Sequence, residues 1–109
     1  YELFAERVIR HFELDGFFDK IAGAPKDIEK PWLKKDSIKR ALEGFSDANS
    51  SNTVIIGDRK FDAEGAKEAG IDSIGVLFGY GKSDELEASS FNMIVPDVKT
   101  LTDVLLKDK

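Results

Sequence analysis

The sequence predicts an α/β fold in which helices flank a parallel sheet, and two observations lead to this prediction. From residue 53 onward, stretches with the residue pattern of a strand alternate with stretches that have the spacing of a helix. The run Thr53-Val54-Ile55-Ile56 is continuously apolar or β-branched, which is typical of a strand buried on both faces of a parallel sheet. Ligands of open parallel sheets bind at the carboxyl ends of the strands, so a site is expected just after such a strand.

The first half of the chain contains two predicted helices. Residues 2–12 place apolar side chains at helical spacing opposite a charged face, and residues 34–45 carry Ile38, Ala41, Leu42 and Phe45 at i, i+3, i+4 and i+7. Between them, Phe17 and Phe18 are expected to pack under the turn that ends the first helix, and residues 20–23 to form a short strand.

The second half predicts three strands, at residues 53–56, 73–77 and 92–95, with helices at 62–69, 83–88 and from 97 onward. Asp62 and Asp97 are expected to cap the amino ends of their helices, and Gly70 to end the first of these helices. The inner face of the last helix is predicted to consist of Val98, Leu101, Val104 and Leu105.

Composition excludes several classes of function. The 109 residues carry 16 Lys and Arg against 21 Asp and Glu, and the net charge of −5 disfavours nucleic acid as a partner. With no cysteine and a single histidine, thiolate metal sites, cysteine nucleophiles and multi-histidine metal sites are excluded. No apolar run reaches the roughly 18 residues that span a bilayer, so we expect no membrane partner. A cytoplasmic location is a separate expectation. The oligomeric state is left open.

Two carboxylates follow the strand at 53–56. Asp58 lies at the end of this strand and Asp62 at the start of the next helix, so the two side chains can converge above the edge of the sheet. Carboxylate oxygens suit Mg²⁺, which takes one or two protein carboxylates and keeps several waters. The spacing alone is equally consistent with Asp58 as a loop residue and Asp62 as a helix cap.

Lys34 begins the second predicted helix. At about 100° per residue it lies about 30° from the centre of the apolar stripe. A lysine there, at the positive end of the helix dipole, is disfavoured unless an anion such as phosphate or a carboxylate cluster pairs with it. The alternative is an exposed lysine of a lysine-rich segment.

Other candidates favour structural roles. His11 lies in an amphipathic helix, and Gly79-Tyr80-Gly81 is interpreted first as a turn after a strand rather than a ligand contact. Glu64 and Glu68 fit a solvated helix face better than a second metal site.

The run from Val54 to Asp62, with Gly65-Ala66-Lys67-Glu68-Ala69-Gly70-Ile71 after it, resembles the fourth motif of haloacid-dehalogenase-like hydrolases, close to the phosphoglycolate-phosphatase-like branch. The segments Ser73–Leu77, Gly79–Gly81 and Leu33–Ile38 are similar to that branch as well, so the resemblance extends over nearly the whole chain. It implies a Rossmann-like core and hydrolysis of a small phosphate monoester through an aspartyl-phosphate, with Mg²⁺ as cofactor. It also implies that Asp58 binds the metal, that Asp62 supports it, and that Lys34 neutralises the nucleophile and the phosphoryl group.

The chain departs from that family because it contains no D-x-D motif, which carries the nucleophile and the acid/base aspartate. We therefore expect residues 1–109 to be the carboxyl-terminal portion of one core domain, with its first strands and cap outside the chain and no turnover by this portion alone. Two of the absent strands would lie between residues 20–23 and the strand at 53–56. Alternatives are a phosphomutase or phosphotransferase of the same superfamily, a receiver-like regulatory module that accepts a phosphoryl group on aspartate, and a non-catalytic binding fragment.

Overall fold

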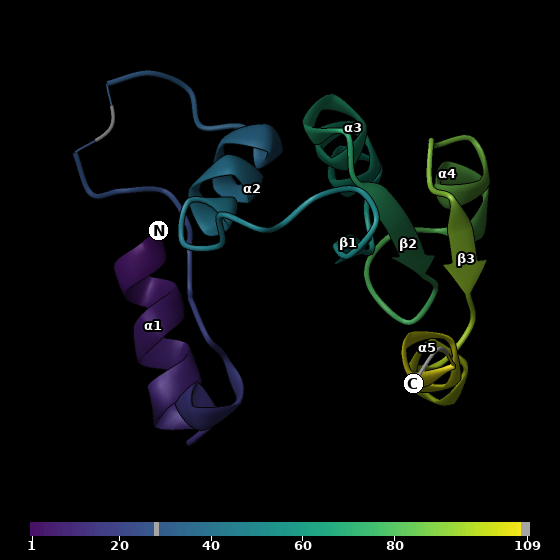
Figure 1. Cartoon of the computed structure of the whole chain (residues 1–109), viewed down its shortest axis with the longest axis horizontal. Coiled ribbons are helices and arrows are strands. Elements are labelled where there is room, and N and C mark those ends of the chain that lie inside the picture. Colours follow the sequence, from purple (N-terminus) through teal and green to yellow (C-terminus); the bar gives the residue numbers. More distant parts are fainter. Residues whose placement is uncertain (28, 108–109) are drawn as a thin grey trace. The chain divides into compact units, whose positions relative to one another are not determined.

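The computed structural model describes residues 1–27 and 29–107, which fall into two compact units (Figure 1). The first unit comprises Tyr1–Ala48 and the second Asn49–Lys109. None of the described helices is both long enough and apolar enough to cross a membrane.

The second unit has the alternating architecture that the sequence predicts. Its elements, in chain order, are β1 (Val54–Gly57), α3 (Lys60–Ala69), β2 (Asp72–Val76), α4 (Ser83–Glu87), β3 (Met93–Val95) and α5 (Val98–Leu106). The strands form a sheet of order β1-β2-β3, and both pairings are parallel. Because the strands are parallel, the carboxyl ends of β1 and β2 lie at the same end of the sheet, where Gly57 is opposite Gly75.

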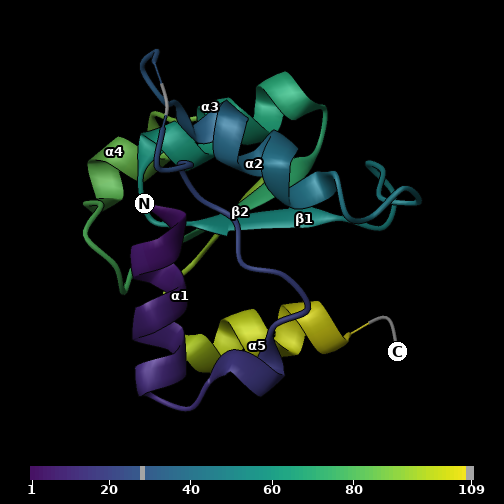
Figure 2. The same cartoon turned by 90° about the vertical axis from the view of Figure 1, so that its left-hand side faces the viewer.

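Two helices cover opposite faces of this sheet, α3 on one side and α5 on the other (Figure 2). Beneath α5, the buried residues Ile74, Val76 and Val95 form the core, and Leu101 and Val104 pack against them. On α3, Ala63 and Ala66 are completely buried. Small side chains at these positions allow the helix to approach the strands closely, which fixes the start of α3 beside the end of β1.

The expected burial of β1 and of α5 is only partly correct. Ile56 in β1 is 43% exposed, whereas the apolar run predicted a strand covered on both faces. Within the described residues β1 is an edge strand, paired on one side with β2, so its neighbours cover it incompletely. At the ends of α5, Val98 and Leu105 are 61% and 42% exposed, since the helix packs on the sheet through its middle.

The first unit contains α1 (Glu2–His11), the 3₁₀ turn η1 (Asp15–Phe17) and α2 (Lys34–Leu42). Ile38 on α2 is buried as predicted. α2 ends before Gly44, a residue that disfavours helix, and Phe45 is therefore outside it.

Two predictions for this unit are wrong. Residues 20–23 form no strand, because Gly23 bonds to the start of α1 instead: its N–H donates to Oε1 of Glu2 (3.1 Å), and the Glu2 N–H donates to the Ala24 carbonyl (2.9 Å). Phe17 and Phe18 are not packed under the turn but are 83% and 51% exposed. Among residues 1–27 and 29–48 the structure shows no sheet that could supply an apolar layer for the two rings.

Candidate active site at the carboxyl end of β1

Asp62 holds the loop between β1 and α3. It lies in the first turn of α3, where its Oδ2 accepts the backbone N–H groups of Asp58 (3.0 Å) and Arg59 (3.2 Å). Arg59, and not Asp62 as the sequence predicted, is therefore the residue that precedes the helix. The side chain reaches back to N–H groups at the helix start, which lack partners within the helix. Asp62 itself is buried, at 7% exposure, and its two hydrogen bonds are partly shielded from water.

Gly57 makes room for this carboxylate. A Cβ at Gly57 would overlap Cβ, Cγ and Oδ2 of Asp62. The end of β1 and the first turn of α3 therefore approach each other without a side chain between them, and any larger residue at Gly57 would displace Asp62 or shift the end of β1.

The loop after β2 holds Asp58 from the other side. The Tyr80 N–H donates to Oδ2 of Asp58 at 2.8 Å, and a Cβ at Gly79 would overlap the Asp58 side chain. A Cβ at Gly81 would likewise overlap the Asp58 carbonyl oxygen. The Gly79-Tyr80-Gly81 segment is thus a binding partner of Asp58 as well as the turn that the sequence predicted. The two flanking glycines were the available signal for such a close approach.

Arg59 and Glu85 form an ion pair beside this loop, which no sequence motif predicted. Arg59 Nε lies 2.9 Å from Oε2 of Glu85, and the Lys60 N–H donates to the same oxygen at 3.1 Å. The hydrogen bond to Glu85 raises the pKa of Arg59, and the reciprocal bond lowers the pKa of Glu85. Since the partners lie 26 positions apart in the sequence, no local pattern could reveal the pair.

The donor set at this edge fits a hard cation such as Mg²⁺. The Tyr80 N–H occupies Oδ2 of Asp58 and leaves Oδ1 for another ligand. Oδ2 of Asp62 accepts two backbone N–H groups and so holds the loop that carries Asp58, while support of the metal by Asp62 stays a prediction. Within the described part of the chain no three carboxylate, imidazole or thiolate side chains gather into a metal-binding group. Asp58 and Asp62 therefore offer only part of a coordination shell, as is normal for Mg²⁺, which keeps several waters.

The remaining predicted residues lie in the first unit. Lys34 is the first residue of α2 and is exposed. Lys34 belongs to the first unit, whereas Asp58 and Asp62 belong to the second. That the three side chains meet therefore stays a prediction. His11 ends α1 with its ring edge-on to Phe12, at 4.9 Å between centroids, which agrees with a structural or surface role.

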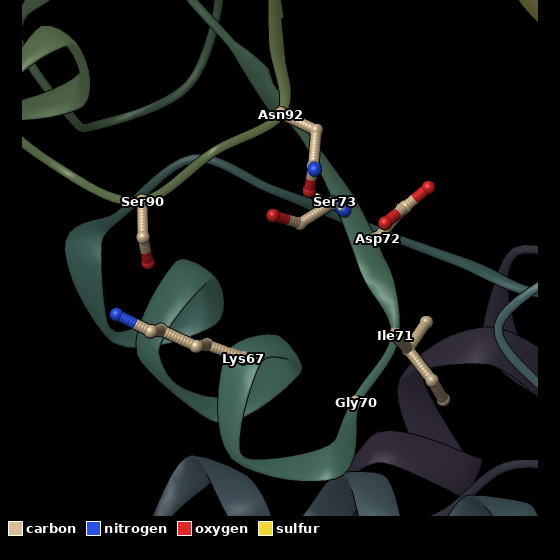
Figure 3. A pocket seen from close by; sticks show the side chains of 7 residues that line it. All are labelled: Lys67, Gly70, Ile71, Asp72, Ser73, Ser90 and Asn92. Carbon is tan, nitrogen blue, oxygen red and sulfur yellow. Dashed lines mark hydrogen bonds between the residues drawn. The ribbon is translucent and has the colours of Figure 1, made fainter.

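A cavity of about 310 Å³ lies at the opposite edge of the sheet, around the amino ends of β2 and β3 (Figure 3). Asn92 and Ser73 bond to each other there: Oδ1 of Asn92 accepts the Ser73 N–H at 2.9 Å, and the Ser73 carbonyl accepts the Asn92 N–H at 3.0 Å. Lys67 and Ser90 point into the same space. This cavity lies at the amino ends of the strands, whereas Asp58 lies at their carboxyl ends, so the cavity is not part of the Asp58 site.

Residues 31–101 match the model of the HAD-hydrolase-like family, in which HAD stands for haloacid dehalogenase. The chain belongs to this family. The match includes Lys34, Asp58 and Asp62 and covers well over half of the chain, so the resemblance noted in the sequence is confirmed at the level of the family.

Solved structures and curated proteins agree with this HAD-like assignment. A predicted phosphatase from Clostridium acetobutylicum superposes with a TM-score of 0.89 at 35% identity, over 97% of this chain and 48% of that one. A putative phosphatase from Clostridium difficile gives 0.88 at 39% identity, over 96% and 48%. The 5'-nucleotidase of Pseudomonas aeruginosa is 33% identical over 94% of this chain and 46% of its own length. The tyrosine-protein kinase PtkA of Mycobacterium tuberculosis is 34% identical over 83% and 30%.

The HAD-like chain thus spans less than half the length of these relatives. The likeness confirms the predicted fold class, a parallel sheet flanked by helices. In each of these relatives the similarity covers only part of the chain.

Proposed function

We propose that this chain is the carboxyl-terminal part of the core of a Mg²⁺-dependent phosphatase, which hydrolyses a small phosphate monoester in the manner of the phosphoglycolate-phosphatase-like branch. The observation that carries the proposal is the position of Asp58. Its carboxylate lies at the carboxyl end of β1 and accepts the Tyr80 N–H, while its own backbone N–H donates to Asp62. A carboxylate fixed from two sides at that edge is suited to bind a cation that neutralises a phosphate.

In this proposal each residue of the chain has a separate task. Asp58 supplies one carboxylate oxygen to the metal site, and Asp62 keeps Asp58 in place through the loop backbone. Lys34 brings an ammonium group that neutralises the transferring phosphoryl group. When bound, Mg²⁺ stabilises negative charge that develops on the phosphoryl oxygens. The nucleophile would be an aspartate outside residues 1–109. Its carboxylate would attack the phosphorus and displace the alcohol oxygen of the substrate, and water would then hydrolyse the aspartyl-phosphate to inorganic phosphate and the free carboxylate.

The domain organisation belongs to the same proposal. Residues 1–109 would form the carboxyl-terminal portion of a single core domain, in which further strands pair with the open edge of β1. The coverage of about 48% of each phosphatase chain supports this arrangement, as does the exposure of Ile56 on β1. We propose a small phosphorylated metabolite as the partner, no binding to nucleic acid or membranes, and a cytoplasmic location.

The test uses the protein that contains this chain together with the segment bearing the nucleophile. Phosphate release from phosphoglycolate and from p-nitrophenyl phosphate is measured with Mg²⁺, with EDTA, and in the Asp58→Asn variant. We expect EDTA to abolish the activity and Asp58→Asn to lower kcat/KM by about 100-fold or more, since even indirect support of a metal is worth about 10- to 100-fold. Activity that survives both changes would overturn the proposal.

Asp72→Asn is the matched control. It makes the same chemical change at the start of β2, on the opposite edge of the sheet, where Asp72 is exposed. We expect it to leave kcat/KM within about twofold, because surface substitutions away from a site change little. An equal loss in both variants would show that Asp58→Asn acts through the fold and not through the site.

A phosphotransferase of the same superfamily is a second candidate, and the 34% identity to the tyrosine-protein kinase PtkA favours it. Hydrolysis and transfer differ in whether water or a hydroxyl group accepts the phosphoryl group. Radiolabelled ATP is incubated with the protein and a tyrosine-containing peptide. Label in the peptide supports transfer, whereas label released only as inorganic phosphate supports hydrolysis.

A further inference from the structure

Arg59 lies beside the proposed metal site and carries a charge that opposes a cation there. It directly follows Asp58 and is three residues before Asp62, and its guanidinium group interacts electrostatically with both carboxylates. Arginine pairs readily with carboxylates through two parallel hydrogen bonds. An arginine free to turn toward Asp58 would therefore compete with a divalent cation for the same oxygens.

Glu85 on α4 holds this guanidinium group in another direction. Arg59 donates through Nε to Oε2 of Glu85 (2.9 Å) and through Nη2 to Oε1 (3.3 Å), which makes the pair two-pronged. Oε2 also accepts the Lys60 N–H, at the first residue of α3. The Glu85 side chain is 26% exposed and the Arg59 side chain 43%, so the pair is partly shielded from water.

The ring of Phe61 further limits where the guanidinium group can go. The Arg59 Cζ atom lies 5.4 Å from the centre of this ring, a distance at which cations and aromatic rings attract each other. Glu85 and Phe61 thus both contact Arg59, and the hydrogen bonds that the structure shows for its guanidinium group go to Glu85.

We propose that Glu85 is a positioning residue, which binds Arg59 so that the carboxylate of Asp58 stays available to a divalent cation. The proposal rests on the metal-dependent function given above. It assigns to α4 a part in metal affinity although no side chain of α4 is a metal ligand.

The test measures Mg²⁺ binding by isothermal titration calorimetry, in the same protein that is used for the activity assay. In Glu85→Gln we expect the Kd for Mg²⁺ to rise about tenfold, because the released guanidinium group pairs with Asp58. Glu87→Gln is the matched control: it removes the same charge from the same helix, and Glu87 bonds to Ser83 and not to Arg59. We expect its Kd to stay within about twofold of the unaltered protein.

A double variant separates positioning from a general loosening of the loop. If Glu85 acts through Arg59, then Arg59→Ala combined with Glu85→Gln restores the Kd to within about threefold of the unaltered protein, because no guanidinium group remains to compete. A double variant that binds as weakly as Glu85→Gln alone would overturn the inference, and so would a Glu85→Gln protein with unchanged affinity. If the unaltered protein gives no binding heat with Mg²⁺, the proposed metal-dependent function fails together with the inference.

Discussion

Replacing Gly57 with alanine tests the packing on which the candidate site depends. The added methyl group would occupy the space of the Asp62 carboxylate, which is buried and accepts two backbone N–H groups. Either Asp62 moves and loses those hydrogen bonds, or the end of β1 shifts. Hydrogen bonds to a charged group are worth about 1.5–3 kcal/mol each, and overpacking costs about 1–3 kcal/mol. Loss of both hydrogen bonds would cost about 3–6 kcal/mol, and a shifted strand about 1–3 kcal/mol, so we expect a loss of about 3 kcal/mol in the free energy of unfolding, where the two ranges meet.

Urea unfolding monitored by circular dichroism measures this change, with Gly16→Ala as the control. Gly16 has no atom within 4 Å of the position where a Cβ would lie, and its backbone is not left-handed, so the control should stay within about 0.5 kcal/mol. Because small domains have only about 5–15 kcal/mol of stability, the expected loss is large. If Gly57→Ala unfolds at the same urea concentration as the unaltered protein, Asp62 does not pack against β1 as described.

Two further predictions concern contacts away from the site. Asn92→Ala leaves the N–H of the buried Ser73 without its acceptor, so we expect the free energy of unfolding in urea to fall by about 1–3 kcal/mol. Ser90→Ala, beside the same cavity, is the control and should change this free energy little. Equal effects of the two variants would contradict the prediction. Hydrogen bonds from Arg40 and Gly23 lower the pKa of Glu2 from 4.5 to about 2. The stability that Glu2 adds over Glu2→Gln is therefore fully present above pH 4.5 and is lost as the pH falls toward 2, and a difference independent of pH would refute it.

Local patterns predicted most of the second unit correctly. Asp97 caps α5 as expected, since its Oδ1 accepts the Thr100 N–H at 2.7 Å, and Gly70 ends α3 in the left-handed conformation with φ of 72°. Both features depend only on residues within one turn of the helix. The position of Asp62 was predicted less well, because a carboxylate just before a helix and one in its first turn can accept the same N–H groups.

The sequence by itself determined the alternation of strands and helices and the two aspartates that follow β1, because these depend on the spacing of neighbouring residues. Only the tertiary structure decided that β1 is an edge strand, that the Tyr80 N–H binds Asp58, and that Glu85 binds Arg59. These features join residues more than 20 positions apart or depend on the order of strands in the sheet. Such contacts exist only once β1 and β2 are side by side, which places the loops that follow them at one edge.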